Sequence, residues 1–214
     1  ASSGRFGLMT SRWFYLFVFF SSISPAASPE TMAAKFNRVM DIGKQAPTWK
    51  ELLGVDNKKH SLNNLKKAKV VVVVFTCNHC PVAQSYEQRL IKLANEYSQK
   101  GVKLVTVSVS RFEADSLEAM KKRSAVRKYP FAYLQDPTQK MGKQYGALWT
   151  PSAFLLDGKR RIAYMGGIDD SMYPDKVKRR YLKDAIDALL AGKPVEITET
   201  KPVGCTIDYQ QPPL

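Results

Sequence analysis

The chain has 214 residues, of which 44% are apolar and 24% charged, so it is long enough to form one globular domain with its own core. Glycine and proline, 12 of each, are too few for a collagen-like or low-complexity chain, and three cysteines are too few for a small disulfide-stapled protein. The formal net charge of +14 excludes an acidic disordered tail. The basic residues form short scattered groups without an interleaved RNA-binding motif, and we therefore expect a solvated basic surface and no nucleic-acid partner.

The first 28 residues have the composition of a secretory signal. Their only charged residues are Arg5 and Arg12, the apolar run from Trp13 to Phe20 follows, and small residues complete the segment. An apolar run this short cannot span a bilayer, which needs about 20 residues of helix. We therefore expect export to a periplasmic or other extracytoplasmic location, with cleavage after Ala26 and no stable membrane span. If the signal stays uncleaved, it acts as a membrane anchor.

The remaining sequence predicts a linker at 29–41, one domain at 42–198 and a tail at 199–214 that contains Cys205. Strand and helix patterns alternate through the domain. In chain order they predict a short helix or turn at 62–69, a strand at 70–75 and a helical pattern over 83–97, with Gly101 as the residue that terminates the helix. A strand at 102–109, a helix at 115–128 and a turn at 136–137 followed by a helix to 145 come next. The domain ends with a hairpin of 153–156 with 161–165 and a closing helix at 175–191.

Two of these segments indicate the kind of sheet. Val70 to Phe75 is a continuous apolar run, five of whose six residues are valine, which is typical of a central strand buried on both faces. Asp157-Gly158 is a turn sequence that predicts an antiparallel hairpin. Alternation of strands and helices that ends in a hairpin predicts an α/β fold with a central mixed sheet flanked by helices.

The chemistry of the chain is expected at Cys77 and Cys80, which follow the valine-rich strand and precede a helix. Two thiols at this spacing can close a small disulfide ring. A helix N-terminus favours a thiolate, so Cys77 is predicted to have a lowered pKa, to be exposed and to be alkylated first at pH 6. Cys80 would be the covered partner that resolves a mixed disulfide. His79 would modulate the pair as a local cation, or would be an uncoupled surface imidazole.

Two other uses of the cysteine pair are weighed against this one. A structural zinc site needs four ligands, and the remaining candidates, Cys205, His60 and His79, do not form a second ligand pair. We therefore expect no metal and no other bound cofactor. Two inert cysteines on a helix are the other alternative, but the position directly after a strand is the usual context of a redox motif.

Several motifs together resemble the peroxiredoxin-like branch of the thioredoxin superfamily, in the alkyl hydroperoxide reductase/thiol-specific antioxidant group of redoxins. The resemblance covers residues 41–208 and implies a thioredoxin-like fold. The motifs are Ala46-Pro47, Phe75-Thr-Cys-Asn-His-Cys-Pro81, Thr150-Pro151 followed by 153–157, Tyr164 to Asp170, and Pro202 to Ile207.

The resemblance also implies site residues. Cys77 and Cys80 would be the redox pair, and Pro151 would be a cis-proline that faces them and turns the Thr150 backbone towards an extended substrate strand. The sequence departs from the family at Val74, where peroxiredoxins have the hydroxyl residue that precedes the peroxidatic cysteine by three positions. No acidic residue stands in the strand at 70–75 to act as the buried proton acceptor of thioredoxins.

We therefore expect a thiol–disulfide oxidoreductase that exchanges disulfides with protein partners and with an electron donor or acceptor that the sequence does not identify. A thiol-dependent peroxidase is the alternative enzyme. A redoxin-fold module with a purely structural disulfide is the alternative without catalysis. Cys205 is expected to be a buried thiol in a docked segment, because Val203 and Ile207 flank it. An intermolecular partner and a second resolving thiol are the other roles open to it.

Overall fold

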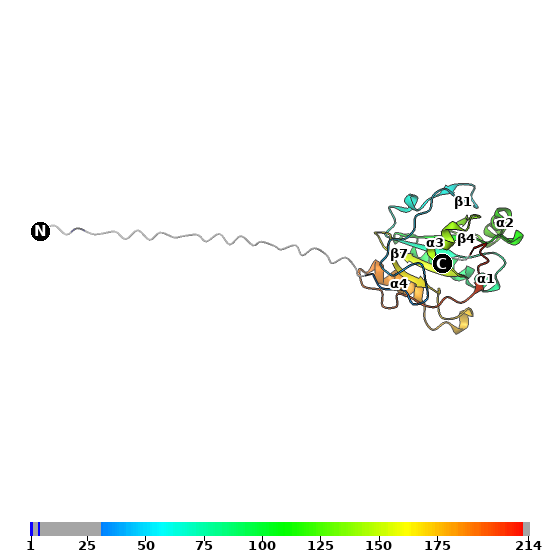
Figure 1. Cartoon of the computed structure of the whole chain (residues 1–214). Helices are drawn as coiled ribbons and strands as arrows, with labels where there is room; N and C mark the ends of the chain where they lie inside the picture. The colour runs from blue at the N-terminus through cyan, green and yellow to red at the C-terminus, as the bar shows by residue number, and fades with distance from the viewer. Residues whose placement is uncertain (2–3, 5–30, 212–214) are drawn as a thin grey trace.

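The computed structural model describes residues 1, 4 and 31–211, and apart from residues 1 and 4 the signal-like segment lies outside the described residues. A seven-stranded sheet has the order β2-β1-β5-β4-β3-β7-β8. Its strands are β1 (Leu52–Gly54), β2 (Lys59–His60), β3 (Val70–Phe75), β4 (Val102–Ser108), β5 (Ala132–Gln135), β7 (Ser152–Leu156) and β8 (Ile162–Gly166). Figure 1 labels β1, β4 and β7 of this sheet among the surrounding helices. Strand β4 pairs in parallel with β3 and β5, and the other pairs are antiparallel, which confirms the mixed sheet.

Four α-helices and a second, small ladder complete the described fold. The helices are α1 (Pro81–Tyr97), α2 (Leu117–Arg127), α3 (Lys140–Tyr145) and α4 (Tyr181–Leu190), and three short 3-10 turns are η1 (Leu62–Leu65), η2 (Glu113–Asp115) and η3 (Pro174–Lys176). Strands β6 (Trp149–Thr150) and β9 (Cys205–Thr206) pair with each other outside the large sheet.

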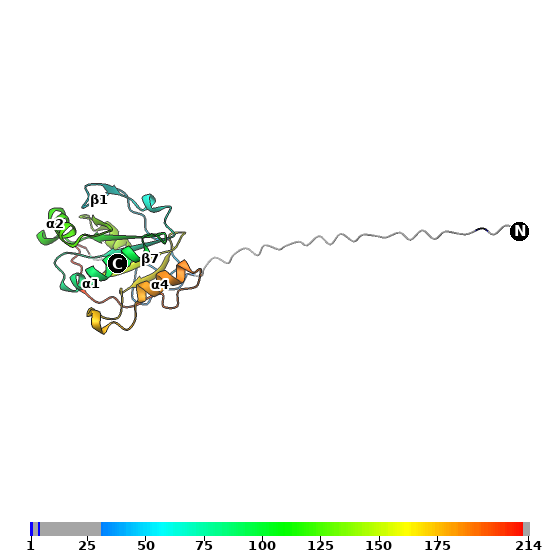
Figure 2. The same cartoon turned by 180° about the vertical axis from the view of Figure 1, so that it is seen from behind.

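Strand β3 is buried on both faces, as its valine run predicts. Val70, Val72 and Val74 pack in a core with residues of α1 and α4, and both views show these helices on one side of the molecule (Figures 1 and 2). The alternate residues, from Val71 to Phe75, pack in a second core with α3 and with Ile207 of the tail. The tail is therefore part of the core layer that covers one face of the sheet.

Two helix boundaries differ from the prediction. Helix α1 ends at Tyr97, and Gly101, with φ of +83°, closes the turn that leads into β4. Helix α4 begins only at Tyr181. The chain before it pairs with the loop after β8, because the Asp170 N–H donates to the Arg179 carbonyl over 3.1 Å and the Lys178 N–H to the Asp170 carboxylate over 2.9 Å. These bonds occupy backbone groups that an earlier helix start would need.

The segment expected as a linker, from residue 31 onward, lies against the domain. The backbone N–H groups of Lys35, Phe36 and Asn37 donate to the Glu199 carboxylate over 2.6–3.1 Å. Met40 is buried in the core. Within residues 1, 4 and 31–211, none of the helices has the length and apolar character that crossing a membrane requires.

Candidate active site

The cysteine motif occupies the loop between β3 and α1. Strand β3 ends at Phe75, and Cys80 is the N-cap of α1, where its sulfur accepts the Ala83 N–H over 3.4 Å. Pro81 is the first helical residue, as expected for a residue without an N–H to donate. Cys77 lies earlier in the loop, three residues before the cap. Helix α1 therefore begins closer to Cys80 than to Cys77, which differs from the predicted placement.

The disulfide of this structure joins Cys80 to Cys205, with 6.0 Å between their Cα atoms, and leaves Cys77 as the free thiol. The sequence favours a Cys77–Cys80 bond and an unpaired, buried Cys205. The second expectation is wrong in this structure, because pairing of β9 with β6 brings Cys205 to the cysteine motif. The first expectation concerns a pairing that is absent here, since Cys80 is already bonded.

Thr150 lies between the cysteines. Its hydroxyl oxygen is 3.4 Å from the Cys77 sulfur, and its carbonyl oxygen is 3.4 Å from the Cys80 sulfur. The Thr150–Pro151 peptide bond is cis. In the β6–β9 ladder, Thr150 is the register partner of Cys205. The Thr150 backbone, which the family resemblance assigns to a substrate strand, is thus paired with the protein's own tail.

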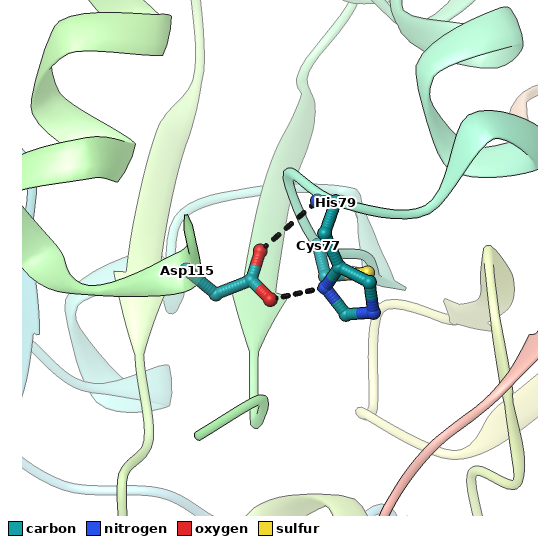
Figure 3. Close-up of side chains that lie close together, drawn as sticks. All are labelled: Cys77, His79 and Asp115. Atoms are coloured by element: carbon teal, nitrogen blue, oxygen red, sulfur yellow. Dashed lines mark hydrogen bonds and ion pairs between the residues drawn. The ribbon is translucent and has the colours of Figure 1, made fainter. Parts of the chain in front are cut away.

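Asp115, at the end of η2, is a site residue that the sequence analysis did not identify. Its side chain is completely buried, and its carboxylate points towards His79 of the cysteine loop (Figure 3). One oxygen accepts the N–H groups of Asn78 and His79 over 2.5 and 3.3 Å. The other accepts the Ser110 hydroxyl over 2.5 Å and His79 Nδ1. Four donors therefore satisfy this buried charge.

His79 forms a hydrogen bond with the buried carboxylate of Asp115. Its Nδ1 donates to this carboxylate, so the orientation of the ring is held by Asp115 (Figure 3). In the neutral ring this leaves Nε2 with a free lone pair. The Phe112 ring contacts the imidazole edge-on at 4.8 Å between centroids. Asp115 thus fixes the orientation of a potential proton acceptor next to Cys77.

The Cys77 thiol is less acidic than the sequence predicts. Burial is the main cause that raises its pKa, and the negative charge of Asp115 raises it further. The Thr150 hydroxyl and the N–H groups of Cys80 and His79 act in the opposite direction, but they do not reverse the shift. Only 5% of Cys77 is exposed, so the prediction of an exposed thiol with a lowered pKa is wrong for this state. Cys80 is fully covered, as expected.

The tail is one of the segments that surround Cys77. A cavity of about 20 Å³ adjoins Cys77, His79 and Thr150, and the tail residues Thr206 to Asp208 form part of its wall. A cavity of this volume holds about one water molecule. This space is too small for a segment of a protein substrate while the tail lies in this position.

Cys77, His79 and Asp115 are also the donors with which a metal ion could be held. One donor atom from each lies within 4.8 Å of the others, and they are the one such group among the described residues. Hydrogen bonds already occupy the Asp115 oxygens and His79 Nδ1. Without breaking them, the cluster offers a sulfur and one nitrogen, fewer than the four ligands of a structural zinc site.

Comparisons with known proteins agree with the thioredoxin-like fold. A family model described as the AhpC/TSA family matches residues 42–165. An uncharacterised conserved protein from Geobacillus kaustophilus is 35% identical, with a TM-score of 0.76, and the match covers 84% of this chain and 97% of that one. A hypothetical protein from Sinorhizobium meliloti 1021 is 28% identical, with a TM-score of 0.73 and the same coverage of both chains.

A more distant structure has a functional description. A candidate thiol:disulfide interchange protein DsbE from Chlorobium tepidum is 23% identical, with a TM-score of 0.59, and the match covers 71% of this chain and 99% of that one. At this identity the likeness supports the fold alone. A comparison with curated proteins gave no match.

Proposed function

The chain belongs to the AhpC/TSA family of redoxins, and from that premise we propose that it is a thiol–disulfide oxidoreductase with Cys77 as nucleophile and Cys80 as resolving cysteine. The observation that carries the proposal is the meeting of three sulfur atoms around Thr150, one of them a free thiol beside an oriented His79. Oxidoreductase chemistry in general follows from the family. The exchange with protein disulfides is the specific part of the proposal.

The reaction starts from the form in which Cys77 and Cys80 are both thiols. The Cys77 thiolate attacks a substrate disulfide, forms a mixed disulfide and expels one substrate thiolate, which takes up a proton. The Cys80 thiolate then attacks the Cys77 sulfur and releases the second substrate thiolate. Two electrons have passed from the dithiol to the substrate, and the protein holds a Cys77–Cys80 disulfide. An external thiol or disulfide partner resets the pair.

His79 supports the first step by accepting the Cys77 proton. Burial and the charge of Asp115 raise the pKa of Cys77, so the thiol needs a nearby base near neutral pH. Asp115 stabilises the resulting imidazolium through the Nδ1 hydrogen bond. Thr150 supports the thiolate through its hydroxyl. In this proposal Cys77 and Cys80 are catalytic, His79 is modulating, and Thr150 with Pro151 forms the substrate-binding edge.

Insulin reduction tests this proposal. The fully reduced protein should reduce insulin disulfides, and Cys77→Ser should abolish the activity because it removes the attacking sulfur. Cys205→Ser is the matched control, since it removes one thiol and leaves the proposed pair intact. Equal inactivity of wild type and both variants, with all three folded, would contradict exchange and favour a structural module.

One observation favours the peroxidase as a second candidate. The Thr150 side chain places a hydroxyl group beside Cys77, which the Val74 side chain lacks. The adjoining cavity has room only for a very small molecule. In that reaction the thiolate attacks a peroxide oxygen, forms a sulfenic acid and releases water or an alcohol. Peroxide consumption faster than that of a free thiol, lost in Cys77→Ser, would support it.

We also propose that the protein is exported, with residues 1–28 as its signal. Oxidising compartments favour persistent disulfides, and a Cys80–Cys205 bond is compatible with such a location. Expression of the full chain with N-terminal sequencing of the secreted product tests this. Cleavage near Ala26 is the expected result, and an unprocessed protein that stays with the cytoplasmic fraction would contradict it.

A further inference from the structure

The tail reaches the active site through a close backbone approach at Gly204. A Cβ atom at this position would lie 2.0 Å from the Thr150 carbonyl oxygen, so only glycine fits. The next residue, Cys205, pairs in register with Thr150, and Thr206 pairs with Trp149. The sequence Gly204-Cys205 therefore sets the distance between the tail and the cysteine motif.

Contacts other than the disulfide hold the tail in this position. The Ile207 N–H donates to the Leu148 carbonyl over 2.9 Å, and its side chain is buried in the core. Buried Gln139 donates to the Asp208 carbonyl over 2.7 Å and accepts the Gln210 N–H over 3.1 Å. Cys205 is thus positioned by the docking of its neighbours, and its sulfur would remain near Cys80 if the disulfide opened.

The free thiol of Cys77 lies in a small apolar cluster with the two other cysteines. Cys77, Cys80 and Ala83 pack together, with Cys205 against them. Cys80 can therefore be approached by two sulfurs, one from its own loop and one from the tail. A disulfide on Cys80 with a third thiol nearby is the arrangement in which disulfides exchange.

We propose that Cys205 is a third redox-active cysteine, which alternates with Cys77 as the disulfide partner of Cys80; the proposal rests on the oxidoreductase function above. In the forward step the Cys77 thiol loses its proton, its sulfur attacks Cys80 Sγ, and the Cys80–Cys205 bond breaks. A Cys77–Cys80 disulfide forms, and the departing Cys205 thiolate takes up the proton. The step is an isomerisation, so no outside oxidant or reductant is needed.

This exchange of disulfide partners also affects whether a substrate can reach Thr150 and the cysteine motif. While Cys205 is bonded to Cys80, the tail covers Cys77 and pairs with Thr150. After the exchange the covalent tie is gone, and the Thr150 edge can open to a substrate strand. The Cys80–Cys205 form is therefore a closed, oxidised form. Transfer of the disulfide to Cys77–Cys80 removes its covalent tie and leaves only the hydrogen bonds and packing of the tail for a substrate to displace.

Alkylation of the oxidised, full-length protein tests the proposal. The protein is treated with iodoacetamide at several times, quenched in acid and mapped by peptide mass spectrometry. Both Cys77 and Cys205 should be labelled, in different molecules, and every molecule labelled at Cys205 should contain the Cys77–Cys80 disulfide. The rate at which Cys205 is labelled should not depend on protein concentration. In Cys77→Ser, Cys205 should remain unlabelled.

Gly204→Ala should shift the equilibrium from the Cys80–Cys205 disulfide towards the Cys77–Cys80 disulfide, and it replaces no cysteine. The added methyl group collides with the Thr150 carbonyl, so the ratio of Cys205 to Cys77 labelling should rise roughly tenfold, the size typical of an overpacked site. Gly158→Ala is the matched control, because its Cβ would meet its nearest neighbour at an ordinary 3.5 Å. It should leave the ratio at the wild-type value.

The outcomes separate this proposal from the function on which it rests. Labelling of Cys77 alone, in both wild type and Gly204→Ala, would overturn the redox role of Cys205 and leave a structural disulfide. Reduced Cys205→Ser that still reduces insulin would then keep the oxidoreductase function standing. If Cys205→Ser neither forms a Cys77–Cys80 disulfide on oxidation nor reduces insulin, the oxidoreductase function itself fails.

Discussion

Thr150 and Cys205 are register partners in the β6–β9 ladder, and the same threonine lies 3.4 Å from the sulfurs of both Cys77 and Cys80. One residue is therefore in contact with the nucleophile, the resolving cysteine and the tail. Its backbone aligns the tail, while its hydroxyl acts on the Cys77 thiol. The two roles can be separated by substitution, because only one of them depends on the side chain.

Thr150→Val should make Cys77 less reactive. The Thr150 hydroxyl lowers the pKa of Cys77, so its removal raises that pKa and leaves less thiolate at a fixed pH. Alkylation of Cys77 at pH 8 should slow about tenfold. Thr150→Ser keeps the hydroxyl and should retain the wild-type rate. Equal rates in Thr150→Val and Thr150→Ser would show that the hydroxyl does not stabilise the thiolate.

His79→Gln should change the pH profile of insulin reduction. Near neutral pH the variant loses the base that accepts the Cys77 proton, and we expect a rate loss of about a hundredfold. Well above the raised pKa of Cys77 the thiolate forms without a base, so the two profiles should converge. A constant fractional loss at every pH would mean that His79 shapes the loop but does not accept the proton.

Asp115→Ala should destabilise the protein. The substitution leaves the Asn78 N–H and the Ser110 hydroxyl without their acceptor in a buried site. We expect the free energy of unfolding, measured with urea, to fall by about 3 kcal/mol. Asp175 is exposed, and Asp175→Ala should change it by less than about 0.5 kcal/mol. Similar values for both variants would contradict a structural role for the buried carboxylate.

Ile207→Ala should loosen the tail. The side chain is buried in the core against one face of the sheet, and its truncation costs about 2 kcal/mol. We expect faster proteolytic removal of the tail and faster alkylation of Cys77. Val203 lies in the same tail but is 69% exposed, so Val203→Ala should have neither effect. If both variants resist the protease as the wild type does, the disulfide alone holds the tail.

The elements predicted best are those whose signal is local. The valine run of 70–75 and the Asp157-Gly158 turn specify a buried strand and a hairpin, because burial and turn geometry act on consecutive residues. The closing helix begins at Tyr181 and not at the predicted residue 175, since a hydrogen bond between Asp170 and Arg179 overrides the local pattern there. Tertiary pairing of this kind leaves no periodic signal.

The candidate site is predicted only in part, because contacts between residues far apart in the sequence leave no local signal. The spacing of Cys77 and Cys80 identifies the motif, but the partner of Cys80 lies 125 residues away in sequence, and pairing at that distance depends on the docking of the tail. Asp115 stands at the start of the helix predicted over 115–128, where an acidic residue is expected for the helix dipole alone. Its contact with His79 is created only when η2 and the cysteine loop meet at the end of the sheet.

Trapping of a mixed disulfide tests the central claim most directly. In the Cys80→Ser/Cys205→Ser double variant, Cys77 is the sole cysteine, so it can attack insulin but cannot be resolved or captured by another thiol of the chain. The account predicts a covalent adduct that disappears with a reductant and maps to Cys77. Further replacement of Cys77 by serine should abolish it. A folded double variant that forms no adduct with a protein disulfide would contradict the assignment of Cys77 as the nucleophile.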